Sequence, residues 1–207
     1  MEIKTIEKEV KQTHIIEKSK FIAHLFPCDR KSDAQVILEN IRKQYIDATH
    51  VCYAYIIMEE NVVFYKSSDD GEPSSTAGAP ILNVLKKNHL TNVLCIIVRY
   101  FGGIKLGAGG LTRTYSNCAA AVVMQSNIVI LKEAFLYELI FDYENKKEVD
   151  RFLDKNSIKI NDKVFELKVV YTLFIFDKEL FLEAFNKIAY LPVVLKEKQQ
   201  LMARQVL

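Results

Sequence analysis

Residues that could do chemistry gather between positions 69 and 113. One group is the acidic loop sequence DDGEPSST, in which Asp69, Asp70 and Glu72 could hold a magnesium ion or supply a general base. The other is the glycine-rich sequence YFGGIKLGAGG, which begins at residue 100. All seven glycines of the chain lie in this interval, where backbone must turn sharply or approach a partner closely.

The glycine-rich sequence predicts an anion-binding site. Backbone N–H groups at the start of a helix attract anions, and missing side chains let a phosphate or carboxylate come close. The expected binding residues are Arg99, Gly102, Gly103, Lys105, Gly107, Gly109, Gly110 and Arg113. The alternative is that the glycines only permit a tight turn and close packing of helix on sheet. Neither a Rossmann fingerprint nor a P-loop fits, because Thr112 replaces the third Rossmann glycine and no Gly-Lys-Ser/Thr follows.

Charge along the chain is uneven around this site. The whole protein carries +2, yet the 60 residues from Pro73 to Lys132 contain no Asp or Glu and six Lys or Arg. The rest of the chain therefore sums to −4, from 22 basic and 26 acidic residues. A basic, acid-free interval is typical of a surface that binds a polyanion. Chance, together with helix-dipole matching by Lys86 and Lys87, is the competing interpretation.

The acidic loop also has a purely structural interpretation. Asp-Asp-Gly-Glu-Pro is favourable turn chemistry, its spacing matches no calcium loop, and Ser75 or Thr76 could cap a following helix. The four cysteines and four histidines are scattered without metal-ligand spacing, so no metal or cofactor is expected and the thiols should be buried and reduced.

Apolar periodicity predicts an α+β protein with two domains, 1–131 and 132–207. In the first, a helix is expected at 32–45, a hairpin at 50–66, a short helix after Thr76, a central strand at 93–101 and a helix at 109–126. In the second, strands and helices follow the order β-α-β-β-α-β, the split βαβ pattern of ferredoxin-like domains. The charged N-terminus and the short apolar runs predict a cytoplasmic protein without membrane contact.

Two segments resemble the signature of the YigZ/IMPACT family: DDGEPSSTAGAPIL and NVLCIIVRYFGGIKLGAGGLTRTYS. The resemblance extends over essentially the whole chain, with a bacterial YigZ-type second domain. It departs at Ser75, where many members have glycine, which predicts that this loop needs no positive φ. It also departs at Thr112 and Thr114, where small apolar residues are usual.

The resemblance implies a first domain similar to domain IV of elongation factor G and its ribosomal-protein relatives, and a ferredoxin-like second domain similar to domain V. It also implies a role in translation, because eukaryotic IMPACT members are protein-binding regulators of translation. The resulting hypothesis is a non-enzymatic module that contacts RNA, the ribosome or a translation partner through the basic glycine-rich surface. Two alternatives stay open: an enzyme on a small phosphorylated or carboxylated substrate, and a regulator that binds only protein.

Overall fold

The apolar run at 93–101 forms strand β6 (Val93–Tyr100) in the computed structural model, which describes residues 3–60 and 62–206. As predicted, β6 is the central strand of a five-stranded antiparallel sheet. The sheet order is β2 (Val10–Ile16), β3 (Ser19–Pro27), β6, β4 (His50–Glu59) and β5 (Val62–Ser68). The predicted hairpin at 50–66 is the β4–β5 pair.

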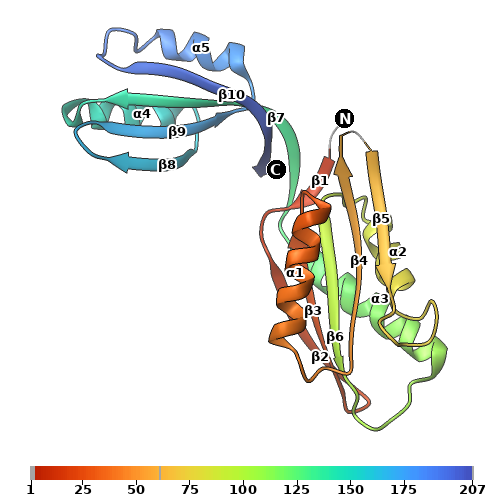
Figure 1. The fold of residues 1–207 in the computed structure, drawn as a ribbon. Helices are drawn as coiled ribbons and strands as arrows, with labels where there is room; N and C mark the ends of the chain where they lie inside the picture. Colours follow the sequence, from red (N-terminus) through yellow and green to blue (C-terminus); the bar gives the residue numbers. More distant parts are fainter. Residues whose placement is uncertain (1–2, 61, 207) are drawn as a thin grey trace. The chain divides into compact units, whose positions relative to one another are not determined.

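Helices cover both faces of this sheet (Figure 1). Helices α2 (Gly78–Lys87) and α3 (Gly107–Gln125) pack on one face, and α1 (Lys31–Gln44) packs on the other. Alternate residues of β6 serve the two cores: Val93, Cys95 and Ile97 face α2 and α3, while their neighbours face α1. This two-sided burial explains why β6 is a continuous apolar run.

A hairpin that the sequence did not predict joins β2 to β3. Glu17 and Lys18 form its two-residue turn, and both have positive φ, at 45° and 64°. Two positive φ values in a two-residue turn are typical of type I′, a geometry that asparagine and glycine adopt more easily. Strand β1 (Ile3–Ile6) precedes this hairpin.

The chain forms two compact units. The first contains the described residues up to Ile130 together with Val206, and the second contains Leu131–Gln205. Strand β7 (Ile128–Phe141) pairs with β1 and also belongs to the sheet of the second unit.

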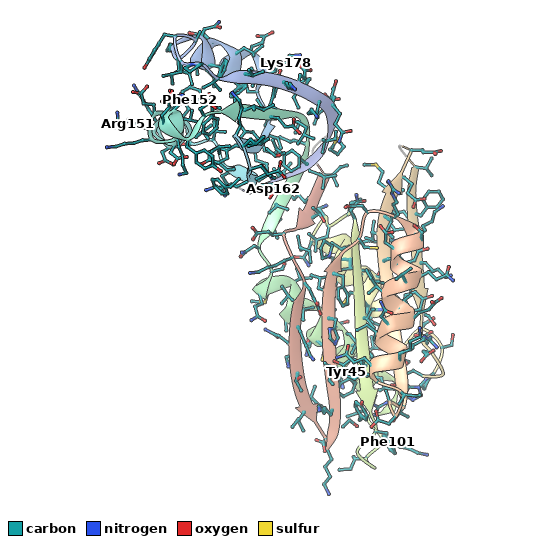
Figure 2. The ribbon with its side chains drawn as sticks, turned by 60° about the vertical axis from the view of Figure 1, so that its left-hand side comes forward. Tyr45, Phe101, Arg151, Phe152, Asp162 and Lys178 are labelled. Carbon is teal, nitrogen blue, oxygen red and sulfur yellow. The ribbon has the colours of Figure 1, made fainter. Side chains whose placement is uncertain are left out.

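The second unit has the predicted β-α-β-β-α-β order. It consists of β7, the 3-10 turn η1 (Tyr143–Asn145), α4 (Lys146–Lys155), β8 (Ile160–Phe165), β9 (Val169–Ile175), α5 (Lys178–Asn186) and β10 (Val194–Val206). Its strands lie in the order β10-β7-β9-β8, so the ferredoxin-like prediction is confirmed. Asp177 caps α5, accepting a hydrogen bond from the Leu180 N–H at 3.0 Å. On α4, Phe152 is buried and the neighbouring Arg151 is exposed (Figure 2).

Candidate functional site

Asp69, the first residue of the acidic loop, holds the start of α2. Its carboxylate accepts hydrogen bonds from the N–H groups of Ser75, Ala77 and Gly78 at 2.8, 2.9 and 2.8 Å. Burial alone would raise the pKa of Asp69, but these three donors together lower it. The prediction that Ser75 or Thr76 caps α2 was wrong: no side chain at the cap position does so, and Asp69 reaches the helix start from nine residues upstream.

Asp70 ties the same loop to the sheet and to α1. One carboxylate oxygen accepts a hydrogen bond from Arg42 and the other from the Val51 N–H, both at 2.7 Å. The Asp70 carbonyl lies 2.8 Å from His50 Nδ1. Both carboxylate oxygens therefore already have partners within the protein.

Glu72 is buried and faces Arg99 at the end of β6. Arg99 Nη1 donates to Glu72 Oε1 at 2.6 Å, and the Tyr115 hydroxyl donates to the same oxygen at 2.7 Å. Arg99 is only 4% exposed and its Nη2 donates to Ser19 Oγ at 3.3 Å. The Arg99 charge is thus compensated inside the protein and is not presented to an external anion.

Further polar groups extend this buried network. Cys52 Sγ lies 3.3 Å from the Tyr115 hydroxyl and 3.0 Å from the Asp69 carbonyl, and His50 Nε2 lies 3.8 Å from Glu72 Oε2. Burial raises the pKa of Cys52 to about 12 and, with Cys52 and Glu72 beside it, also raises the pKa of Tyr115. Both groups are therefore protonated near neutral pH and serve as donors within the core.

Lys105 and Arg113, by contrast, line one open groove. The groove has a volume of about 510 Å³. Its lining residues are Ile16, Glu17, Ile104, Lys105, Leu106, Gly110, Arg113, Thr114 and Asn117. Lys105 and Arg113 are exposed, and neither forms an ion pair within residues 3–60 and 62–206. Glu17, in the β2–β3 turn, is the one carboxylate among the lining residues, which leaves the groove with a formal charge of +1.

The first turn of α3 adds positive potential to this groove. It has no acidic residue, and no side chain caps it. Arg113 Nη1 lies 3.5 Å from the position that a Cβ on Gly109 would occupy, so this cation folds back over the helix start. A cation beside the positive end of a helix dipole is unfavourable unless an anion joins them.

The glycines of the basic stretch serve different purposes. A Cβ on Gly102 would lie 2.0 Å from the Lys18 carbonyl carbon, so Gly102 lets two backbones meet at the β2–β3 turn. Gly103 and Gly107 have positive φ in open surroundings, and Gly107, Gly109 and Gly110 lie in the first turn of α3. The stretch therefore includes both the open loop of the anion-site hypothesis and the close packing of its alternative.

The expectation of no positive φ at Ser75 was also wrong. Ser75 has φ of 63°, the region that glycine occupies most easily, and its N–H donates to Asp69. This hydrogen bond holds Ser75 in the left-handed conformation, which costs a non-glycine residue about 1 kcal/mol or more.

The structure also shows which residues complete the site. Four residues of the site were not among the predicted ones: Glu17, Ser19, His50 and Tyr115. Their contacts form only when the sheet and helices pack together, so no local sequence pattern indicates them. Across the described ranges, no cluster of three His, Cys, Asp or Glu side chains is arranged to hold a metal ion, and no helix has the length and apolar character to cross a membrane.

Fold and site together define a two-unit α+β protein whose first unit is an Impact N-terminal domain, matched over residues 17–123. The chain belongs to the IMPACT family. It is 35% identical to the IMPACT family member YvyE of Bacillus subtilis over 84% of this chain and 80% of that protein. It is 33% identical to an IMPACT family member of Haemophilus influenzae over 83% of this chain and 82% of that protein. A crystal structure of a hypothetical protein covers 96% of this chain and 98% of its own, with 25% identity and a TM-score of 0.62.

Proposed function

We propose that this protein is a non-enzymatic, translation-associated regulator that contacts RNA through the groove at the start of α3. The observation that carries this proposal is the meeting of Lys105 and Arg113 in one open groove beside an uncapped helix N-terminus. Phosphates are the natural partners of such a surface, because exposed N–H groups and cations both favour them. Membership of the IMPACT family supports the translational part, because the family resemblance implies a role in translation.

The arrangement gives less support to an enzyme acting on a small anion. Such an enzyme would need the acidic loop and the glycine loop to converge on one pocket. Instead, Asp69, Asp70 and Glu72 are engaged by internal donors, and none of the three is among the residues that line the groove. The chemistry that the acidic loop could offer is used to hold the fold.

Fluorescence anisotropy with a labelled single-stranded RNA across a salt series tests the proposal. If two or three phosphates are neutralised, log affinity should fall with log salt at a slope of roughly −1.4 to −2. The double variant Lys105→Glu/Arg113→Glu should bind much more weakly and lose most of that slope.

The matched control is Lys86→Glu/Lys87→Glu, which makes the same change in net charge at the far end of α2. Both lysines are exposed and neither lines the groove. This control should bind RNA nearly as well as the wild type. Equal losses in the two double variants would show that net charge, and not the groove, governs binding.

The same variants can be tested on ribosomes by co-sedimentation, with and without nuclease. Retention that depends on RNA and on Lys105 and Arg113 supports the proposal. If the protein still co-sediments after nuclease treatment, and the Lys105→Glu/Arg113→Glu variant co-sediments as well as the wild type, the proposal is overturned in favour of a protein partner.

A further inference from the structure

Phe101 is an exposed aromatic residue three positions before Ile104, which lines the proposed RNA groove. It follows the last residue of β6, at the end of the first unit's sheet (Figure 2). Its side chain is 45% exposed although the eight strand residues before it are largely buried. Of the aromatic residues near the glycine-rich stretch, Tyr115 is fully buried and Tyr100 is partly buried, whereas Phe101 is exposed.

Hydrogen bonds hold the backbone at Phe101 and Gly102 in place. The Phe101 N–H donates to Thr49 Oγ1 at 3.0 Å, and the next N–H, from Gly102, donates to Ser19 Oγ at 3.2 Å. Gly102 also packs directly against the Lys18 backbone. Because the backbone is held on both sides of the ring, a ligand that stacks on Phe101 loses little free energy to ordering this segment.

One side of the ring is already covered by protein. The guanidinium carbon of Arg99 lies 5.4 Å from the Phe101 ring centroid, and Arg99 itself is buried. Arg99 therefore approaches from the interior, and the exposed part of the ring faces solvent. A cation on the inner face adds a favourable cation–π contact that helps to fix the ring.

The ring and the groove lie within reach of one short oligonucleotide. Ile104, which lines the groove and is 38% exposed, is three residues from Phe101, so their Cα atoms are at most about 11 Å apart. Lys18 connects the two features, because it packs on Gly102 and is adjacent to Glu17 in the groove wall.

We propose that Phe101 is a stacking platform for one base of a single-stranded RNA whose phosphates lie along Lys105 and Arg113. This inference rests on the proposed function and specifies its ligand. An aromatic face beside a cationic groove is how proteins hold single strands without reading sequence. A protein partner is less well matched, since Phe101 and Ile104 alone provide little of the roughly 1,000 Å² that a stable protein interface buries.

Binding of an oligouridine single strand and of an RNA duplex to Phe101→Ala and Phe101→Tyr tests the platform. Loss of one stacked base should weaken single-strand binding by about tenfold in Phe101→Ala. The salt slope should stay unchanged, because no charge is removed. Phe101→Tyr keeps the ring and should bind within about twofold of the wild type, and duplex binding should be the same in all three proteins.

Two outcomes separate this inference from the proposed function. If Lys105→Glu/Arg113→Glu abolishes binding while Phe101→Ala binds the single strand as tightly as the wild type, the groove stands and the platform is overturned. If the wild type binds no RNA, both fail. Photocrosslinking of 5-bromouridine RNA to the wild-type protein gives a readout that does not depend on whether a variant folds. Crosslinks at Phe101 support the platform, and crosslinks confined to the second unit overturn it.

Discussion

The charged side chains of the acidic loop are directed into the protein, whereas those of Lys105 and Arg113 in and after the glycine-rich loop are exposed. In the acidic loop, the carboxylates of Asp69, Asp70 and Glu72 all turn toward internal donors. In the glycine-rich loop, Lys105 and Arg113 turn toward solvent and share a groove. The charged residues of one loop build the scaffold, and those of the other are available to a ligand. Charge in a loop is therefore a guide to function only once its partners are known.

The largest effect should follow removal of Glu72. Glu72→Ala leaves Arg99 buried without its carboxylate, and losing one partner of a buried ion pair costs about 3–5 kcal/mol. Urea unfolding followed by circular dichroism measures this loss. A change below about 1 kcal/mol would mean that the network is not part of the scaffold, and the contrast between the loops would disappear.

Gly102→Ala should have the next largest effect. The added Cβ would overlap the Lys18 backbone, and overpacking of this kind costs about 1–3 kcal/mol. Gly103→Ala is the matched control, since space around Gly103 is open and only its positive φ opposes the substitution. Thermal unfolding should rank Gly102→Ala as the less stable variant; the reverse order would show that the loop is not anchored at the β2–β3 turn.

Asp69→Asn should cost about 1–2 kcal/mol, because an amide keeps one acceptor oxygen for the start of α2 but leaves the Ser75 N–H facing an NH2 donor. The pKa of Asp69 is lower in the folded protein than its ordinary value of 3.8, so its stabilisation is complete above that pH and is lost as pH falls through the folded value. The stability difference between wild type and variant should therefore be constant near neutral pH and shrink in acid. A difference that grows in acid would contradict the assignment.

The smallest effect on stability is expected in the glycine-rich loop. Lys105→Ala and Arg113→Ala should each change the free energy of unfolding by no more than about 0.5 kcal/mol, because both side chains are exposed without an internal ion pair among the described residues. The same two variants should weaken RNA binding. A loss of stability comparable to that of Asp69→Asn would place these cations in the scaffold as well.

Much of the fold could be predicted because its signals are local. The apolar run of β6, the β4–β5 hairpin and the split βαβ order of the second unit all follow from hydrophobic periodicity. The caps of α1 and α2 could not be predicted, because they come from distant residues: Asp69 holds α2 from nine positions away, and Glu59 on β4 accepts a hydrogen bond from the Lys31 N–H at the start of α1.

The site was predicted less completely, although one signal was present in the sequence. Arg99 is in phase with Val93, Cys95 and Ile97, the β6 residues that face α2 and α3. Period-2 alternation alone therefore places the Arg99 side chain on a buried face, where it needs an acidic partner. The identity of that partner, Glu72, depends on how α3 and the acidic loop pack, which no local pattern encodes.

The β2–β3 turn has a consequence for how the protein can evolve. Glu17 and Lys18 both adopt a backbone geometry that asparagine and glycine would tolerate at lower free energy. An Asn-Gly tip would make the hairpin more resistant to heat, and it would also remove Glu17, the one carboxylate that lines the groove. Replacing Glu17 leaves Lys105 and Arg113 in the groove with a formal charge of +2, so a variant selected for stability at this position should keep its affinity for an anion or gain some.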